Sequence, residues 1–444
     1  MRSRRLPIDL KAALAILAVT LFVTSAWAPP REKVLHNFSQ YSTDGYYPAA
    51  SLIFDAHGIL YGTTSGGGAH NAGMVFKLTP KAGGGWIEEI LHNFNDNGRD
   101  GAHPSASLIF DADGNLYGTT YYGGSLDQCG GYGCGTVFEL TPKAGGGWTE
   151  KVLHNFSGKD GSSPNARLVV DADGSLYSTT TGGGVGGGGT VFELTPHGGG
   201  WTEKTLHNFS GRDGFYPVAG VVMDDVGNLY GTTTFGGSIP CNFGNEVGCG
   251  TVFELTPKGG GNWTEKVLHN FNYNGKDGVS PQGDLTTDAA GNLYGTTYYG
   301  GPFNDQCDSS SFGCGTVFEL TSKVGRGWTE KVLHSFNENG SDGTFPQAGL
   351  IFDAHGNLYG TTSGGGLTQC TGSFGCGTVF ELRPKSDGGW TERILHNFNG
   401  RNGAYSTAGL IFDAHGNLFG TTFEGGPTPC NGGAGCGTAF EITP

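Results

Sequence analysis

Positive charge is scarce in this chain. Its 444 residues include 25 Lys and Arg against 40 Asp and Glu, which gives a formal net charge of −15. Charged residues of both signs make up 15% of the chain, below the roughly 25% that is usual in soluble domains. Nucleic acids and anionic membrane surfaces recruit basic proteins, so neither is expected as a partner.

Helical periodicity is also missing. No window after residue 28 shows a sustained 3.6-residue hydrophobic period, so helices are not expected in the mature chain. No linker or change of composition divides residues 29–444, which predicts one large domain. Glycine is abundant at 84 residues, but it has no three-residue period and falls at the same turns again and again. Disorder is therefore the weaker interpretation of this glycine content.

The chain does contain a repeated tetrapeptide. Leu-His-Asn-Phe, once changed to Leu-His-Ser-Phe, begins at Leu35, Leu91, Leu153, Leu206, Leu268, Leu333 and Leu395. Successive copies lie 56, 62, 53, 62, 65 and 62 residues apart. Solenoid coils are shorter, at roughly 20–47 residues, whereas a propeller blade needs about 40–50 residues plus loops. The repeat therefore predicts a propeller with seven blades.

Each copy has the pattern of four short strands, a to d. In the second copy they are expected at 107–111, 115–120, 135–141 and 148–156, with Gly, Pro and Asp at the turns. Radial repetition buries the faces of such a meander between its neighbours. The predicted fold class is thus all-β, a seven-bladed β-propeller of four-stranded antiparallel blades. The blades are expected at about 45–94, 100–156, 160–209, 213–271, 277–336, 342–398, and 402–444 together with 30–38.

The closure of the ring is expected to join the two ends of the chain. The seventh copy reaches the end of strand c at residue 443, and a spare strand d is found at 30–38. Aligned with 148–156, this segment places Pro30 at the Trp148 position and His36 at the His154 position. Residues 32–38 are therefore predicted to pair beside 436–443.

Residues 1–28 have the features of a secretory signal. Basic residues are followed by an apolar stretch over 10–23 and by Ala26-Trp27-Ala28, which predicts cleavage after Ala28. An uncleaved membrane anchor is the alternative, although the apolar stretch is short for a span of about 20 residues. Cleavage leaves 21 basic and 39 acidic residues. The predicted location is secreted or periplasmic, with no membrane span after cleavage, and a monomer is expected.

The ten cysteines fall into local pairs, each between strands b and c. The pairs are Cys129/Cys134, Cys241/Cys249, Cys307/Cys314, Cys370/Cys376 and Cys430/Cys436. Even, pairwise cysteine in an exported chain predicts disulfides. Metal binding is the alternative, but the spacing varies and no histidine recurs in these loops, unlike structural zinc sites. These disulfides would stiffen long surface loops.

Seven histidines and seven aspartates recur at fixed positions. The histidines (His36, His92, His154, His207, His269, His334 and His396) lie on strand d, far from one another, so each is interpreted as a hydrogen-bond partner, for instance of a Thr in Gly-Thr-Thr. The aspartates (Asp55, Asp111, Asp171, Asp224, Asp288, Asp353 and Asp413) precede a glycine by three residues, as in a hairpin turn. Calcium binding is the alternative for the aspartates, although no bidentate Glu follows. No metal or cofactor is expected.

Variation between copies concentrates on the d–a and b–c loops, which share one face. This face carries the paired cysteines and the aromatics Tyr46, Tyr47, Tyr121, Tyr122, Phe215, Tyr216, Phe235, Tyr298, Tyr299, Phe345, Tyr405 and Phe423. Variable loops on a rigid frame often carry function, and Tyr suits contact with sugar or peptide; the alternative is packing beneath the loops. At the start of strand a, Arg167 and Asp284 break the symmetry near the channel mouth. The two residues are expected either to orient a polar ligand or to neutralise each other.

The consensus Gly-x-x-x-Asp-x-x-Gly-Asn-Leu-Tyr-Gly-Thr-Thr, followed by Gly-Thr-Val-Phe-Glu-Leu, is clearest at 349–362 and 377–382. It resembles the GloVer-type tandem repeat of exported bacterial proteins, and more distantly the propellers of NHL and streptogramin-lyase-like proteins. The first resemblance implies an exported repeat scaffold and carries no activity with it. Its members often end in a surface-anchoring segment, and none is recognised in this sequence.

The sequence favours a non-catalytic scaffold that binds an extracellular glycan or protein on the disulfide-loop face. The candidate ligand contacts are Arg167, Asp284, Tyr46, Tyr47, Tyr121, Tyr122, Phe235, Tyr298, Tyr299 and Phe423. The alternative is a polysaccharide lyase or streptogramin-lyase-like enzyme acting at the channel mouth. Catalysis requires a nucleophile or base set against an orienting partner, and no catalytic residue is identified. A surface-layer structural protein is a third class, which lacks its anchor.

Overall fold

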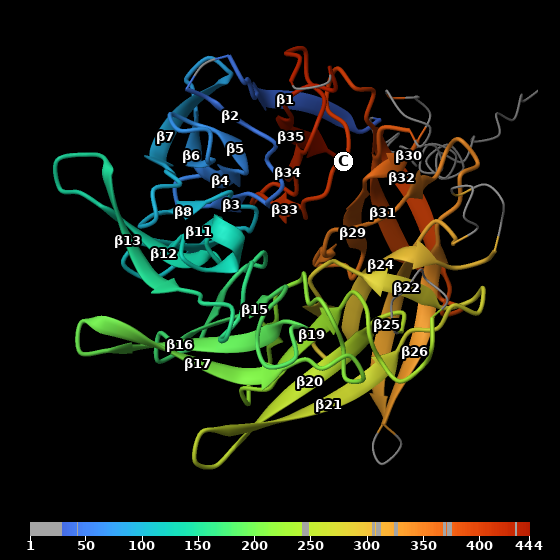
Figure 1. Ribbon diagram of the computed structural model, residues 1–444. Coiled ribbons are helices and arrows are strands. Elements are labelled where there is room, and N and C mark those ends of the chain that lie inside the picture. The colour runs from blue at the N-terminus through green and yellow to red at the C-terminus, as the bar shows by residue number, and fades with distance from the viewer. Residues whose placement is uncertain are drawn as a thin grey trace, which may run out of the picture.

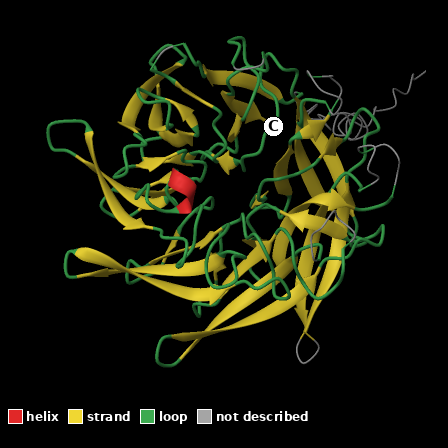
Figure 2. Ribbon diagram, viewed as in Figure 1, coloured by secondary structure: helices red, strands yellow, loops and turns green. Residues whose placement is uncertain are grey.

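Seven antiparallel sheets are arranged radially around a central axis in the computed structural model (Figures 1 and 2). The structure describes residues 29–444 except 42, 242–247, 304–306, 308–311, 324–326, 367–369, 371–374 and 431–432. Residues 1–28, and with them the predicted signal, lie outside the described part. The prediction of a seven-bladed all-β propeller is confirmed.

Each blade contains four strands, and the order from the axis outward is a, b, c, d. Strands a are β3 (Ile53–Phe54), β9 (Ile109–Phe110), β14 (Val169–Val170), β18 (Val222–Met223), β23 (Thr286–Thr287), β28 (Ile351–Phe352) and β33 (Ile411–Phe412). Strands b are β4 (Leu60–Thr64), β10 (Leu116–Thr120), β15 (Leu176–Thr180), β19 (Leu229–Thr233), β24 (Leu293–Gly300), β29 (Leu358–Thr362) and β34 (Leu418–Thr422). Strands c are β6 (Met74–Pro80), β12 (Thr136–Pro142), β16 (Thr190–His197), β20 (Thr251–Lys258), β25 (Thr316–Lys323), β31 (Thr378–Pro384) and β35 (Thr438–Thr443). Strands d are β7 (Trp86–Asn93), β13 (Trp148–Asn155), β17 (Gly200–Asn208), β21 (Asn262–Asn270), β26 (Gly327–Ser335), β32 (Trp390–Asn397) and β1 (Arg31–Asn37).

The two ends of the described chain meet in one sheet. Strand β1 pairs antiparallel with β35, with Val34 opposite Phe440 and Asn37 opposite Thr438. Figure 1 shows β1, in blue, beside the red strands of the last blade. The predicted closure of the ring is therefore confirmed.

Phenylalanine pairs join each blade to the next. The Phe of each Leu-His-Asn-Phe copy packs edge-on against the Phe of the neighbouring Gly-Thr-Val-Phe strand or its equivalent, as Phe94 does against Phe138 with ring centroids 5.0 Å apart. All seven interfaces repeat this contact, at centroid distances of 5.0–5.2 Å. Strand b passes so close to the ring that a Cβ on Gly118 would lie 2.6 Å from Phe138 Cζ. This close approach favours Gly at this position, although Ser178 occupies it in the third copy.

Three features were not predicted. Short ribbons connect the d–a and b–c loops, namely β2 (Gly45–Tyr46) with β5 (Gly66–Gly67), β8 (Gly101–Ala102) with β11 (Tyr122–Gly123), and β27 (Gly343–Thr344) with β30 (Gly364–Gly365). In the fifth blade, β22 (Gly278–Pro281) makes the same connection to β24. One 3-10 helix, Cys129–Gly131, interrupts a b–c loop. Among the described residues, no helix has the length and apolar character needed to cross a membrane.

Candidate functional site

The inner loops of the seven blades share an uncommon backbone conformation. In each d–a loop one non-glycine residue has a positive φ, between 53° and 60°: Tyr47, His103, Ser163, Tyr216, Ser280, Phe345 and Tyr405. Six of these residues precede a proline, and Ser406 takes that place in the last blade. Non-glycine residues in this conformation cost on the order of 1–3 kcal/mol and need support from their surroundings.

Hydrogen bonds from the preceding blade supply that support. The backbone N–H of each left-handed residue donates to a carbonyl in the neighbouring b–c loop, as Tyr405 N does to Cys376 O at 3.0 Å. In five of the seven cases the acceptor is the second cysteine of a disulfide: Cys436, Cys134, Cys249, Cys314 and Cys376. The disulfide loops therefore hold the loops that approach the axis.

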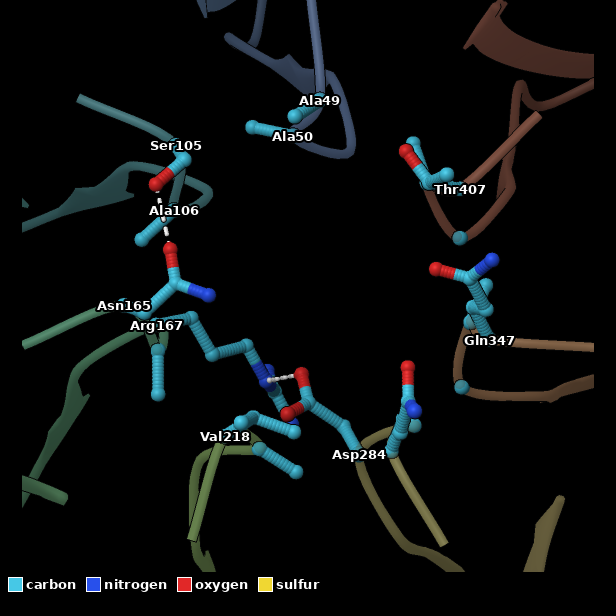
Figure 3. Close-up of a pocket in the computed structure, with 18 of the residues that line it drawn as sticks. Ala49, Ala50, Ser105, Ala106, Asn165, Arg167, Val218, Asp284, Gln347 and Thr407 are labelled. Carbon is cyan, nitrogen blue, oxygen red and sulfur yellow. Dashed lines mark hydrogen bonds and ion pairs between the residues drawn. The ribbon is translucent and has the colours of Figure 1, made fainter. Parts of the chain in front are cut away.

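A cavity of 640 Å³ lies where these inner loops converge. Its wall takes residues from all seven d–a loops and, in the fourth and seventh blades, from the residues that follow strand b. Figure 3 shows side chains from different blades arranged around this common space. Since d–a and b–c loops emerge on the same face, the cavity belongs to the disulfide-loop face.

One ion pair crosses part of the cavity wall. Arg167 Nε lies 2.8 Å from Asp284 Oδ2, and the two side chains are 37% and 30% exposed. The other carboxylate oxygen, Asp284 Oδ1, accepts a hydrogen bond of 2.7 Å from Gly220 N. The pair thus spans three consecutive blades. Their charges cancel within the wall, so the site presents no net charge from this pair.

Neutral polar groups also line the cavity. Asn165 accepts a hydrogen bond from Ser105 through Oδ1, and its amide nitrogen points into the open space (Figure 3). On the other side, Gln347 donates from Nε2 to Ser363 Oγ at 3.0 Å, and its amide oxygen faces the cavity. The buried hydroxyl of Thr407 has no hydrogen-bond partner among the described residues. The wall therefore offers both donors and acceptors.

Aromatic rings form part of the cavity wall. Tyr216, Phe235 and Phe423 line the cavity. Tyr216 is 39% exposed. Phe423 is fixed by stacking on Tyr47, with ring centroids 4.7 Å apart and an interplanar angle of 12°. An apolar and aromatic lining with a small number of polar groups is the usual composition of a small-ligand site.

The repeats of this chain match the sequence profile of one protein family over almost their whole length. The profile of the family described as Gloeobacter/Verrucomicrobia repeat matches residues 24–131, 126–366 and 241–444. The chain belongs to the Gloeobacter/Verrucomicrobia repeat family. The resemblance seen in the repeat consensus is thereby confirmed.

Solved structures similar to this Gloeobacter/Verrucomicrobia repeat protein include three distant ones. A candidate 6-phosphogluconolactonase of Bacteroides uniformis has 11% identity and a TM-score of 0.49, covering 80% of this chain and 86% of its own. The periplasmic gluconolactonase PpgL of Pseudomonas aeruginosa has 14% identity and a TM-score of 0.47, covering 79% and 84%. A luciferin-regenerating enzyme has 10% identity and a TM-score of 0.45, covering 94% and 95%. These likenesses carry no argument about activity, and curated proteins gave no match.

The ten candidate contacts of this repeat protein separate into two groups. Arg167, Asp284, Phe235 and Phe423 line the cavity. The other six lie outside its wall and pack within the loops: Tyr46, Tyr47, Tyr121, Tyr122, Tyr298 and Tyr299.

Specific contacts hold these six rings. Tyr46 donates to Asn71 Oδ1 at 2.6 Å. Tyr298 stacks on Phe345 of the next blade at 5.1 Å. The rings of Tyr121 and Tyr122 pack against each other at 4.6 Å.

Several residues of the cavity wall were missed by the sequence analysis. They are Ser105, Asn165, Gln282, Gln347 and Thr407, all two residues before the position of Arg167 and Asp284 in their own repeats. This column varies between copies as strongly as the one that was considered, so a signal was present. Tyr216 belongs to the variable aromatics of the sequence, but only the structure places it at the cavity.

The five predicted disulfides are present, and the described residues contain no free cysteine. Each bridge closes a b–c loop, with Cα atoms 5.0–5.3 Å apart. Several disulfides in one chain are typical of proteins that fold in an oxidising compartment. The chain therefore has the character of an extracellular or periplasmic protein.

The repeated turn aspartates bond their own turns, as predicted. Asp111 Oδ1 accepts from the backbone N–H groups of Asp113 and Asn115, both at 2.9 Å, and Gly114 has a φ of 84°. The structure adds a bond from Tyr117 Oη to Asp111 Oδ2 at 3.0 Å. Burial opposes ionisation, but these bonds prevail and hold the pKa of Asp111 below its usual value. Both carboxylate oxygens are thus engaged by protein donors.

The suggested Thr partner of the repeated histidines is wrong. His154 Nε2 lies 2.9 Å from Asp160 Oδ2, the aspartate of the Asp-Gly pair that follows strand d. Thr hydroxyls are engaged elsewhere, for example Thr119 Oγ1 with Ala166 O of the next blade at 3.2 Å. Six interfaces have a His–Asp pair, and the seventh has Asn402 Nδ2 2.9 Å from His396 Nε2. A Glu on strand d of the next blade approaches most of these pairs.

The seventh interface gives a testable prediction. Burial without a carboxylate partner lowers the pKa of His396 to about 4. Because the folded protein binds fewer protons than the unfolded one between about pH 4 and pH 6.5, this residue costs stability as the pH falls through that window. Asn402→Asp is expected to raise the pKa of His396 by more than about one unit, since an adjacent carboxylate favours the imidazolium.

NMR titration of the imidazole signals checks this expectation, with His396→Asn used to assign the resonance. An unchanged titration of His396 in the Asn402→Asp variant would contradict the role given to the amide.

Proposed function

We propose that this protein is an exported, non-catalytic binding scaffold that takes up a neutral glycan in the cavity at the centre of its disulfide-loop face. The observation that supports it best is the composition of the cavity wall. Amides, hydroxyls and one self-neutralised ion pair line the cavity together with three aromatic rings. Sugars present hydroxyl groups that donate and accept, together with an apolar ring face suited to aromatic contact.

The charges of the wall favour a neutral ligand over an ionic one. Arg167 and Asp284 satisfy each other at 2.8 Å. A phosphate or carboxylate ligand would have to compete with Asp284 for the guanidinium group. A hydroxyl group can instead bond to the remaining donors and acceptors of the pair without separating the two charges.

The same contacts argue for binding rather than catalysis. Among the described residues that line the cavity, the ionisable side chains are Arg167, Asp284 and Tyr216. Asp284 is held by Arg167 and by Gly220 N, and no His or second carboxylate stands beside it in that wall. General acid–base chemistry needs a pair of proton-transfer groups within reach of one substrate.

Export and domain organisation complete the proposal. Five disulfides are consistent with a signal peptide at residues 1–28 and with secretion or a periplasmic location. We take residues 29–444 as one domain, which acts as a monomer.

A glycan array followed by calorimetry with the selected sugar tests the proposed function. Gln347→Ala removes one polar contact and is expected to weaken binding about tenfold. Asp284→Asn leaves Arg167 without its ion-pair partner and is expected to weaken binding by about tenfold to a hundredfold. Tyr132→Ala is the matched control, because Tyr132 is 64% exposed on a disulfide loop and is not part of the cavity wall. Binding that responds to Tyr132→Ala but not to the cavity variants would place the ligand on the loops and refute the proposal.

A further inference from the structure

Among the described residues, five of the seven blade interfaces bring ligand atoms of a His, an Asp and a Glu within 4.8 Å of one another, and in two of these five the His Nε2 has no hydrogen bond of acceptable geometry. The first combines His36 of β1, Asp44 of the following loop and Glu88 of β7; in the second, His334 of β26, Asp342 and Glu392 of β32 take the same places. In each triad the glutamate comes from the next blade, so the three side chains tie two blades together.

The distances within these two triads agree closely. His36 Nε2 lies 3.4 Å from Asp44 Oδ2 and 3.7 Å from Glu88 Oε1. In the second triad, the distances from His334 Nε2 to Asp342 Oδ2 and Glu392 Oε1 are 3.5 and 3.7 Å. Such separations are long for N–H···O hydrogen bonds. No hydrogen bond of acceptable geometry reaches the four buried atoms His36 Nε2, Glu88 Oε1, His334 Nε2 and Glu392 Oε1 from the described residues.

These separations suit three ligands of one metal ion. Nitrogen and oxygen ligands lie about 2.0–2.2 Å from zinc, which places them about 3.3–3.6 Å from one another in a tetrahedron. In both triads, one donor atom from each residue lies within 4.8 Å of the other two. An imidazole with two carboxylates is a donor set for zinc and related divalent transition ions, whereas calcium prefers oxygen alone.

The charge of the triads favours a cation. The side chains of Asp44 and Glu88 are 11% and 16% exposed, and those of Asp342 and Glu392 are 4% and 16% exposed. Each triad brings two carboxyl groups into a place of low solvation, where a divalent ion would neutralise both. The histidines keep about a fifth of their side-chain surface, with 21% for His36 and 20% for His334, so an ion can enter from solvent.

We propose that these two triads are zinc-binding sites that join β1 to β7 and β26 to β32. Each site supplies His Nε2, one Asp oxygen and one Glu oxygen, and leaves the fourth position to water. This inference does not depend on the proposed function, because the triads belong to the outer strands and the cavity lies at the axis.

The interfaces of His154 and His207 provide internal controls. His154 and His207 lie 2.9 and 3.0 Å from Asp160 and Asp213, so these pairs are directly hydrogen bonded. Glu203, beside His154, accepts a hydrogen bond of 3.0 Å from Thr205 through Oε1. A His–Asp pair that is already hydrogen bonded binds an ion less readily, since that bond must first break.

The test measures zinc in the exported chain, purified without a tag, stripped with EDTA and dialysed against zinc chloride. Mass spectrometry of the metal is expected to give about two zinc ions per chain, and calorimetry about two matching sites. His36→Ala and His334→Ala should each remove one ion, and the double variant both. His154→Ala and His207→Ala should retain two, and calcium should not compete.

The conservative variants Glu88→Gln and Glu392→Gln protect the test against misfolding, because they keep the side-chain shape and remove one ligand charge. Each should also lose one ion while the circular dichroism spectrum stays that of the wild type. Failure of the stripped wild type to take up zinc, or equal zinc content in the wild type and the folded double variant, would overturn the proposal. Loss of zinc from the His154→Ala control would overturn the assignment to these two interfaces.

Discussion

A chain that lacks residues 29–38 is expected to lose its cooperative fold. Without β1, the last blade has three strands and the edge of β35 is unpaired. Phe38, which is 1% exposed and packs against Phe76 of the first blade at 5.2 Å, would be lost as well. Two of the seven interfaces would thus be damaged by one deletion. Thermal unfolding followed by circular dichroism should show a broad, early transition or none.

Point variants separate the contributions to this closure. Phe38→Ala alone is expected to cost about 3–5 kcal/mol, as truncation of a buried aromatic usually does. Lys33→Ala should cost less than about 1 kcal/mol, because Lys33 is 54% exposed and its ion pair with Glu441 is 3.7 Å long. Addition of a synthetic peptide of residues 29–41 should restore the transition of the truncated chain. An unchanged melting temperature after the deletion would contradict the closed ring.

Replacing Glu150, Glu265 and Glu330 together with glutamine is expected to stabilise the protein at pH 8. Burial raises the pKa of each of these carboxyl groups to about 7. Asp100, Asp213 and Asp277 raise it further, while His92, His207 and His269 lower it.

Because a raised carboxyl pKa means that the folded state binds more protons, the stability of the wild type falls as the pH rises from about 4.5 to about 7. Glutamine mimics the protonated form and should remove this slope. Allowing for solvent screening, the gain at pH 8 is about 1 kcal/mol for each site, or about 3 kcal/mol in all.

Urea unfolding at pH 5 and pH 8, with EDTA present throughout, measures this difference. The variant and the wild type should be similar at pH 5 and diverge at pH 8. Glu89→Gln is the control, because the side chain of Glu89 is 53% exposed. A triple variant less stable than the wild type at pH 8 would show that the ionised glutamates are net favourable at these interfaces.

The arrangement of the blades could be predicted because the repeat carries it redundantly. Every copy contains the same pattern of apolar segments and turns. Aligning the copies with one another therefore predicts the strands, their order, and the strand that the last blade takes from the other end of the chain. The partners of His92 and its equivalents could not be found in this way. Glu150 belongs to the next copy, and contact between copies depends on how the sheets are twisted and packed.

The cavity was only partly predictable for a related reason. Arg167 and Asp284 stood out because charge is rare in the repeat, and the structure brings them together across Gly220. Asn165 and Gln347 are ordinary loop residues in the sequence, and their shared orientation depends on the left-handed residue two positions earlier. Tyr298 and Tyr299, by contrast, are prominent in the sequence but pack with Phe345.

The seven left-handed positions have a consequence for how such a protein changes over time. Their backbone is fixed by neighbours, yet their side chains in this one chain are Tyr, His, Ser, Tyr, Ser, Phe and Tyr. Exchange of a side chain at these positions therefore leaves the backbone of the inner loops in place, and at Tyr216 it also changes the wall of the cavity. Each blade can therefore vary at this position independently of the other six, so a change of ligand selectivity can arise in one blade without a change in the framework.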